Sequence, residues 1–102
     1  MLVRIWTVDI NSNQIEALEE FANNISLPMF RKQAGCLGVL FTKNSNECAT
    51  ITFWDNQESI DNLAKSEYYQ QVVEEINNSG ILKGNHKTEI YKDYGGFITF
   101  KK

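Results

Sequence analysis

The sequence predicts a small α+β domain whose strands and helices follow one another in the order β-α-β-β-α-β. Residues 2–8 are rich in β-branched and aromatic side chains, residues 13–32 place apolar side chains at helical spacing, and residues 36–54 contain two β-prone runs. With 102 residues, 42% of them hydrophobic, the chain is long enough for one core. We therefore expect one domain over residues 1–94 and a C-terminal tail over residues 95–102.

The first helix is expected to begin at Asn13, whose side chain can cap it, because Glu16 follows three residues later. Apolar side chains then recur at helical spacing as far as Met29. Pro28 lies inside this stretch, so it should kink the helix or split off its last turn.

Residues 36–43 and 47–54 are expected to form a hairpin, because a short polar turn, NSN, separates them. Placing Lys43 opposite Glu47 gives the hairpin two unlike faces. The face expected to lie under the helices is wholly apolar and consists of Leu37, Val39, Phe41, Ala49, Ile51 and Phe53. The opposite face is more polar and consists of Gly38, Leu40, Thr42, Cys48, Thr50, Thr52 and Trp54.

The second helical region is expected to begin with Asp55 and Glu58 as a capping pair and to continue in a helix over residues 67–78. A last strand over residues 85–93 completes a ferredoxin-like arrangement, with helices on one face of an antiparallel sheet.

Arg4 and Trp6 alternate with apolar residues on the first strand and are expected to share the polar face of the hairpin. That mixed face is too aromatic to remain in water and too polar for an ordinary core. We expect a second copy of the chain to cover it, which would give a homodimer with a cavity between the sheets.

The charge of the chain excludes several classes of protein. A net charge of −3 argues against a nucleic-acid-binding protein, an RNA-binding domain of this fold included, and against an anionic membrane as partner. No apolar run approaches the roughly 20 residues of a membrane helix, and the N-terminus is too short and alternating for a signal peptide. We therefore expect a cytoplasmic protein.

Cys36 and Cys48 are expected to be reduced thiols. They lie at opposite ends of the predicted hairpin, roughly 20 Å apart at about 3.3 Å per residue, which is too far for a disulfide. No CxxC pair or His/Cys cluster predicts a zinc site, and NSNQ at residues 11–14 stands where a copper chaperone would need its CxxC loop.

Three segments resemble the antibiotic biosynthesis monooxygenase (ABM) family of dimeric α/β-barrel proteins: VRIW at 3–6, LPMFRKQAGCLGV at 27–39 and ITFWDNQESI at 51–60. Their spacing and the final strand are also similar. The resemblance implies a homodimer whose two sheets face each other, with a pocket in each half. Some members oxidise polycyclic aromatic substrates with O2 and no cofactor, while others degrade haem, isomerise small metabolites or bind them.

The resemblance to the haem-degrading branch is weaker. That branch uses an Asn on its first strand, with a Trp and a His on its second helix. Here the first strand has no Asn before Asn11, the matching helix positions are Leu63 and Val73, and the only histidine is His86. We therefore expect a protein without a cofactor.

Trp54 either packs at the corner between strand and helix or forms a pocket wall beside Thr52. Arg4 and Trp6 suit a site for a phenolate or carboxylate, although a cation–π contact or an ion pair across the dimer would also explain them. Tyr68 and Tyr69 point about 100° apart on a helix, so that one can be core while the other reaches the pocket, and both can simply pack.

His86 is the candidate catalytic base, because an imidazole titrates near neutral pH and cofactor-free oxygenation requires a phenolic substrate to become an electron-rich anion. The alternative is a histidine at the strand edge with no role. The expected function is cofactor-independent monooxygenation of a small aromatic or quinone-like substrate between sheet and helices. A non-catalytic binding protein of the same fold is the main alternative.

Overall fold

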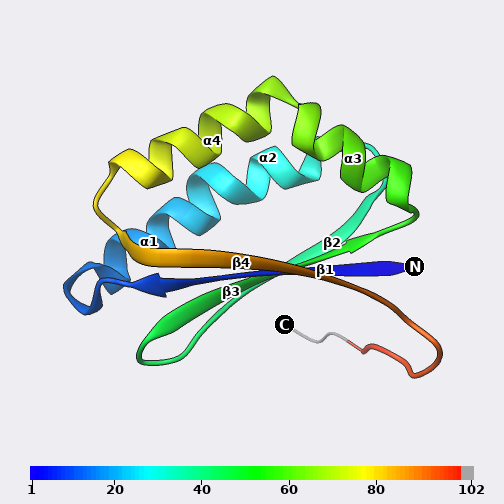
Figure 1. Ribbon diagram of the computed structural model, residues 1–102, viewed down its shortest axis with the longest axis horizontal. Helices are drawn as coiled ribbons and strands as arrows, with labels where there is room; N and C mark the ends of the chain where they lie inside the picture. Colours follow the sequence, from blue (N-terminus) through cyan, green and yellow to red (C-terminus); the bar gives the residue numbers. More distant parts are fainter. Residues whose placement is uncertain (100–102) are drawn as a thin grey trace.

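The computed structural model describes residues 1–99 and confirms the predicted α+β architecture (Figure 1). Four strands form one antiparallel sheet in the order β2-β3-β1-β4. The strands are β1 (Leu2–Ile10), β2 (Cys36–Lys43), β3 (Glu47–Trp54) and β4 (Leu82–Lys92). Both hairpin strands have the predicted bounds, while β4 begins before the predicted residue 85.

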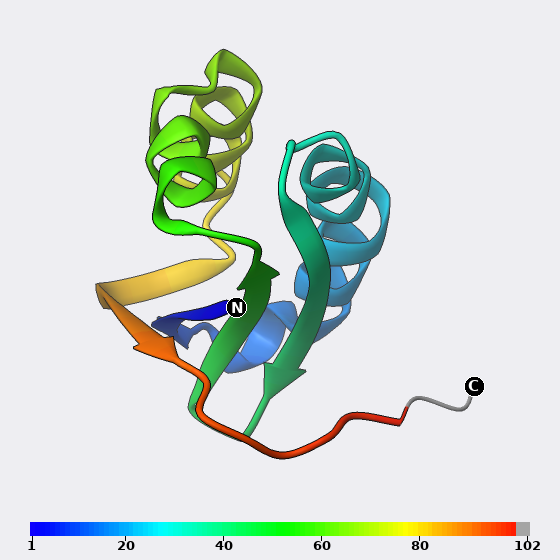
Figure 2. The same ribbon diagram turned by 90° about the vertical axis from the view of Figure 1, so that its right-hand side faces the viewer.

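All helices cover one face of the sheet, as Figures 1 and 2 show. The connection from β1 to β2 contains η1 (Ser12–Gln14), α1 (Ile15–Phe21), η2 (Ala22–Ser26) and α2 (Leu27–Arg31). The connection from β3 to β4 contains α3 (Gln57–Lys65) and α4 (Glu67–Asn78). The two connections lie side by side over the sheet, which is the predicted ferredoxin-like arrangement with one face left bare.

The first helical connection begins differently from its prediction, and it contains the irregularity expected near Pro28. Asn13 does not cap a helix, because it lies within η1, a tight turn in which the backbone N–H of Gln14 donates to the carbonyl oxygen of Asn11 at 2.8 Å. The expected irregularity near Pro28 takes the form of the π-helical turn η2, which ends just before α2 begins. Proline lacks an N–H and its ring crowds the carbonyl four residues earlier, and a wider turn relieves that crowding.

The cap of α3 lies one residue later than predicted. Asn56 Oδ1 accepts a hydrogen bond from the backbone N–H of Ser59 at 3.0 Å, so Asn56 is the capping residue and not Asp55. Asp55 instead accepts from the Ser59 hydroxyl at 2.6 Å. Ser66 caps α4 by accepting from the backbone N–H of Tyr69 at 3.2 Å.

The register of the hairpin is shifted by one residue from the prediction. Lys43 lies opposite Cys48 rather than Glu47, and Val39 lies opposite Thr52. The turn closes one residue outside β2, where Asn44 donates its backbone N–H to the carbonyl oxygen of Glu47 at 2.9 Å. The side chain of Asn44 also accepts hydrogen bonds inside the turn. A shift of one residue moves a strand's side chains to the other face of the sheet.

The shift corrects the predicted faces of the sheet. Val39 and Phe41 lie under the helices as expected, but they share that face with the polar set of β3 and with the even-numbered residues of β1. Trp54, expected to point away from the helices, is 0% exposed and belongs to the core. The buried core residues are Val8, Ile10, Leu18, Phe21, Met29, Phe30, Cys48, Trp54, Ile60, Leu63, Val72 and Ile81.

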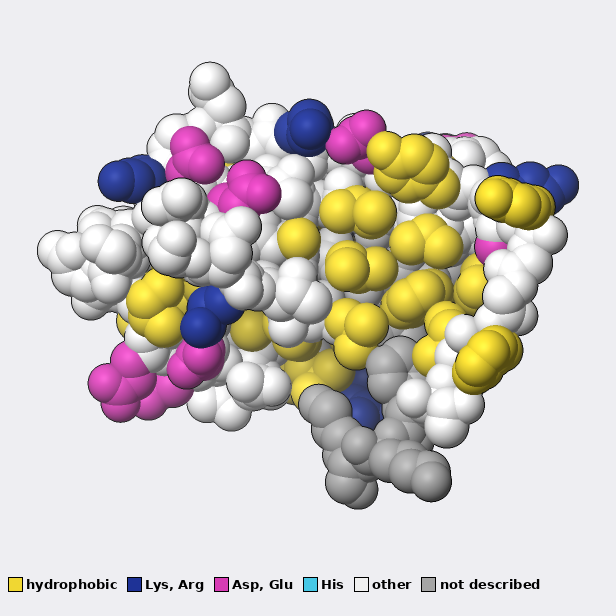
Figure 3. Space-filling view, turned by 90° about the horizontal axis from the view of Figure 1, so that it is seen from below, with side chains coloured by type: hydrophobic (Ala, Val, Ile, Leu, Met, Phe, Trp, Pro, Cys, Tyr) yellow, Lys and Arg dark blue, Asp and Glu magenta, His cyan; other side chains and the backbone are white. Residues whose placement is uncertain are grey.

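The bare face of the sheet is apolar, whereas the prediction had assigned it the polar set. It carries the odd-numbered side chains of β1 and β3, which are only partly buried, and Figure 3 shows hydrophobic side chains gathered across it. Its apolar members are Val3, Ile5, Leu40, Ala49, Ile51, Phe53 and the exposed Tyr91. We call these residues the open face.

Both cysteines are free thiols, as predicted. Cys36 is half-buried and Cys48 is buried, and burial raises the pKa of each. Neither thiol therefore resembles an activated nucleophile. Within residues 1–99, no helix combines the length and the apolar character needed to cross a membrane.

Candidate functional site

A cavity of about 560 Å³ lies between the helix-covered face of the sheet and the helices above it. Its walls are mostly apolar. The sheet contributes Arg4, Trp6, Val39, Phe41, Lys43, Cys48 and Thr50. Leu40 and Thr42 of β2 also border the cavity, although the register places their side chains on the opposite face of the sheet. The helical side contributes Leu18, Glu19, Phe21, Ala22, Asn23, Ser26, Leu27, Met29, Phe30, Arg31, Tyr69, Val72, Val73 and Ile76.

Arg4 and Tyr69 form a polar pair that joins the sheet to α4. Arg4 Nη2 donates a hydrogen bond to the Tyr69 hydroxyl at 3.0 Å, and both side chains are partly buried. Arg4 Cζ also lies 5.8 Å from the centre of the Tyr69 ring. Tyr69 is therefore the tyrosine that lines the cavity, whereas Tyr68 is 38% exposed and does not line it.

Aromatic rings line both sides of the cavity. Trp6 lies on β1, two residues from Arg4 and on the same face of the sheet. Phe30 of α2 and Phe41 of β2 face each other across the layers with ring centres 6.5 Å apart. Flat apolar walls that include a guanidinium suit an aromatic molecule that carries a polar oxygen.

Thr52 and Trp54, two of the predicted binding residues, do not line the cavity. Both are 0% exposed. The indole N–H of Trp54 donates to the Thr52 hydroxyl at 2.8 Å, and that hydroxyl donates to the backbone oxygen of Arg4 at 3.4 Å. In this arrangement the pair supports the strand that carries Arg4, and Thr50 lines the cavity in its place.

His86, the predicted base, lies on the edge strand β4, which contributes no residue to the cavity wall. Its side chain is exposed, and its ring centre is 6.1 Å from that of Trp6. The structure thus brings Arg4, Trp6 and Tyr69 together around the cavity. It places His86 outside the cavity wall, next to Trp6. The role of His86 stays a prediction.

The π-helical turn η2 shapes the helical wall, and three of its residues, Ala22, Asn23 and Ser26, line the cavity. Turns of this kind inside α-helices are frequent at functional sites. Sequence reasoning placed the irregularity near Pro28 without identifying these lining residues. The only signal for them was the proline two residues after Ser26.

The residues that sequence reasoning missed lie mainly on the helices and on β2. Phe21, Met29 and Phe41 line the apolar wall. The sequence predicts Met29 as part of an apolar helical stripe and Phe41 as part of the apolar face of the hairpin, and it does not single out Phe21. Helical spacing shows which side of a helix is apolar. It cannot show whether that side meets other side chains or a cavity.

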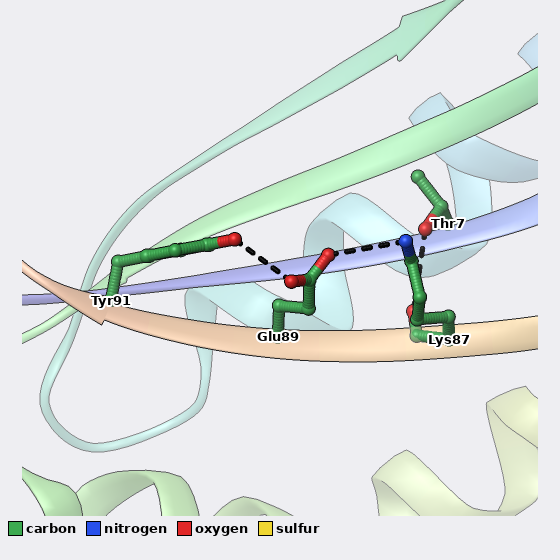
Figure 4. Close-up of polar contacts among 4 residues, drawn as sticks. All are labelled: Thr7, Lys87, Glu89 and Tyr91. Atoms are coloured by element: carbon green, nitrogen blue, oxygen red, sulfur yellow. Dashed lines mark hydrogen bonds and ion pairs between the residues drawn. The ribbon is translucent and has the colours of Figure 1, made fainter.

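A second polar group lies on β4 and is drawn in Figure 4. The strand register places it on the face of the sheet opposite the helices, and none of its residues lines the cavity. The Tyr91 hydroxyl donates to Glu89 at 2.8 Å, and Lys87 Nζ lies 3.3 Å from the same carboxylate. The Tyr91 hydrogen bond, with Lys87 adding to it, lowers the pKa of Glu89, and the same bond raises the pKa of Tyr91. All three side chains are exposed; Tyr91 belongs to the open face, and Lys87 and Glu89 lie beside it on β4.

Among residues 1–99, no His, Cys, Asp and Glu side chains gather in a group that could hold a metal ion. The cavity instead offers an apolar space, a guanidinium and hydroxyl groups. Such a site can bind and orient an aromatic molecule and stabilise negative charge on its oxygen.

The model of the family described as antibiotic biosynthesis monooxygenase matches residues 1–75, which is more than half of the chain. The chain belongs to the antibiotic biosynthesis monooxygenase family. This membership confirms the resemblance read from the sequence. No curated protein matches the ABM chain.

Solved structures share the fold of this ABM protein. A monooxygenase from the ActVA-Orf6 gene of Streptomyces coelicolor, in complex with the ligand nanaomycin D, has a TM-score of 0.82 at 15% identity and covers 96% of this chain and 91% of its own. A candidate antibiotic biosynthesis monooxygenase from Deinococcus radiodurans has a TM-score of 0.76 at 14% identity, and the match covers 99% of this chain and 100% of the Deinococcus chain. A conserved protein from Methanosarcina mazei has a TM-score of 0.75 at 12% identity, and the match covers 92% of this chain and 94% of the Methanosarcina chain. Identities this low show the fold alone.

Proposed function

We propose that this ABM protein is a cofactor-independent monooxygenase that acts on a small aromatic or quinone-like substrate in the cavity. The observation that carries the proposal is the cavity itself, about 560 Å³ between sheet and helices, with the Arg4–Tyr69 pair in an otherwise apolar wall. This volume falls within the roughly 300–1,000 Å³ range of ligand pockets. The structural neighbour named as a monooxygenase, solved with nanaomycin D, supports the proposal.

The chemistry requires no electron donor beyond the substrate. In the oxidation of an anthrone-type carbon to a carbonyl, one atom of O2 becomes the new carbonyl oxygen. The other leaves as water with the two hydrogens of that carbon, so atoms and electrons balance. The protein would orient the substrate, exclude water and stabilise the anion that reacts with O2.

His86 is the proposed base, because it is the only imidazole of the chain and its ring approaches Trp6, which lines the cavity. Trp6 is the proposed wall against which the substrate stacks. The remaining candidates, Thr52 and Trp54, would act by supporting β1 rather than by touching the substrate.

The test is O2 uptake with anthrone, with anthraquinone measured in the same reaction. We expect one quinone for each O2 consumed. His86→Ala should slow turnover by about 100-fold or more, since a general base contributes roughly 10²–10⁴-fold, and Trp6→Ala should raise KM. Lys32→Gln, an exposed change outside the cavity wall, is the control. If polycyclic phenols and anthrones give no turnover, or if both His86→Ala and Trp6→Ala keep full turnover, the enzymatic proposal fails.

A binding protein without catalysis is the second candidate. It is favoured because the described cavity wall contains no histidine, and its one carboxylate, Glu19, is 3.6 Å from the ammonium of Lys43. A ligand that binds the folded state raises the melting temperature by mass action. A thermal shift with anthrones and hydroxyanthraquinones, without O2 uptake, would identify this alternative.

We further propose that the protein is a homodimer that buries the open face. Several partly buried side chains, Ile5 and Ile51 among them, form one continuous apolar surface there. The surface of a typical monomer instead carries single, scattered apolar residues. A second copy of the same sheet would match this surface in shape and chemistry. We also propose that the protein is cytoplasmic.

A further inference from the structure

The cavity collects positive charge in a chain whose net charge is −3. Three cationic side chains line it, Arg4, Arg31 and Lys43, against the single carboxylate of Glu19. Lys43 and Glu19 neutralise each other across β2 and α1 at 3.6 Å. The excess positive charge is therefore carried by the two arginines, and it opposes the charge of the whole chain.

Arg4 is the unusual member of this set, because it is partly buried and its polar partner is neutral. Its side chain donates to the Tyr69 hydroxyl at 3.0 Å. Among residues 1–99, no carboxylate lies within ion-pair distance of it. A guanidinium carries five N–H donors and keeps its charge at any pH that a protein tolerates. Buried charges are normally paired, so a cation at an apolar cavity wall favours an anionic ligand.

We propose that the cavity selects phenolic aromatic ligands in their ionised form, with the phenolate oxygen held by Arg4. This inference rests on the proposed function and narrows its substrate class to phenols that are anions when bound. Trp6, on the same face of β1, would lie beside the ring that carries this oxygen. The Tyr69 hydroxyl fixes the guanidinium by accepting one of its N–H groups and leaves other donors for the ligand.

Selection of the anion changes the acidity of the bound ligand. If the phenolate binds about tenfold more tightly than the neutral phenol, the pKa of the ligand in the complex falls by about 1. Arg4 would in this way favour the electron-rich anion that reacts with O2, because a lower ligand pKa makes the phenol easier to deprotonate. The anion arises by loss of the phenolic proton to His86, the proposed base.

The experiment measures the ionisation of 2-hydroxyanthraquinone, whose visible absorption changes when its phenol loses a proton. Its absorbance is recorded against pH, free and bound to the wild-type protein, with fluorescence or calorimetry giving the dissociation constant at each pH. We expect the bound ligand to ionise at lower pH than the free ligand, by at least about 1 in pKa. 2-Methoxyanthraquinone cannot ionise. At a pH where the hydroxy ligand is ionised, it should bind at least about tenfold more weakly than 2-hydroxyanthraquinone.

Three variants locate the effect. Arg4→Gln should abolish the change in ligand pKa and weaken binding of the hydroxy ligand about 10- to 100-fold, while binding of the methoxy ligand stays nearly constant. Arg4→Lys, which keeps the charge, should retain part of the pKa change. Lys32→Gln removes an exposed cation outside the cavity wall and should behave as wild type. Circular dichroism confirms that each variant is folded.

The inference is overturned if the wild-type protein binds both ligands equally well, or if the bound phenol ionises at the same pH as the free one. It is also overturned if a folded Arg4→Gln variant keeps the full change. The wild-type titration decides the matter even if Arg4→Gln does not fold. These results would leave the proposed aromatic site intact, whereas failure of both anthraquinones and of anthrone to bind would refute the proposed function as well.

Discussion

Thr52 is a hydroxyl-bearing residue that the helices bury completely. Its oxygen accepts the indole N–H of Trp54 at 2.8 Å and lies 3.4 Å from the backbone oxygen of Arg4, to which it donates. One threonine thus satisfies the only polar atom of a buried tryptophan side chain and braces the residue that presents a charge to the cavity. The structure around Trp54 therefore explains its position by packing and hydrogen bonding.

Replacing Thr52 by valine keeps the shape of the side chain and removes this hydroxyl. The indole N–H of Trp54 would then be buried without a partner, which typically costs about 1–3 kcal/mol. Urea unfolding should show this loss of unfolding free energy. Thr88→Val, on exposed β4, is the matched control and should change stability by no more than about 0.5 kcal/mol. Equal effects of the two substitutions would show that the buried hydrogen bond does not stabilise the fold.

At the scale of elements, the corner between α2 and β2 packs against the corner between β3 and α3. The backbone N–H of Asp55 donates to the carbonyl oxygen of Gly35 at 3.0 Å. Gly35 has φ +81°, and a Cβ at this position would collide with the side chains of Ser59 and Asp55. Both corners are thus held together at a residue that must be glycine for conformation and for space.

Gly35→Ala and Gly80→Ala separate these two requirements. Gly80 has nearly the same backbone conformation, φ +82°, but open space around its Cα. Gly80→Ala should cost about 1–2 kcal/mol from the left-handed conformation alone. Gly35→Ala should cost more, by about 1–3 kcal/mol of overpacking. The difference is measured by urea unfolding of both variants, and similar losses would mean that the corner yields without strain.

The hairpin shows how a local detail decides a whole face. The bounds of its two strands could be predicted from the sequence, but the turn closes on Asn44 and Glu47, whereas the prediction paired Glu47 with Lys43. Because side chains alternate along a strand, this single step placed Thr50 and Trp54 under the helices and turned Ile51 outward. The polar turn residues predicted a turn but not its closing pair.

At the scale of the molecule, the sheet separates two environments. One face and the helices enclose the cavity, and the open face presents partly buried apolar side chains (Figure 3). A small domain buries a limited share of its surface alone, so pairing through the open face would add apolar burial. The polar row of Lys87, Glu89 and Tyr91 would then form part of the rim of such an interface (Figure 4).

Ile51→Lys tests this dimer, because Ile51 lies on β3 within the open face. A charge there should be tolerated in a monomer exposed to water but not in a buried apolar interface. Light scattering after gel filtration should change from the mass of two chains to that of one. Gln71→Lys, on the exposed side of α4, adds the same charge as a control and should leave the dimer intact. A monomeric wild-type protein, or a dimeric and folded Ile51→Lys variant, would refute the proposed interface.

The sequence by itself determined the order of elements, the bounds of the hairpin strands and α4, the family, and the alternation that joins Arg4 to Trp6. These features depend on local spacing, turn residues and side-chain periodicity, which a chain carries before it folds. Only the tertiary structure decided that Tyr69 meets Arg4 at the cavity, that Thr52 and Trp54 are core, and that His86 lies beyond Trp6. Those outcomes depend on register and on packing between elements distant in sequence, where a shift of one residue reverses the environment of every side chain on a strand.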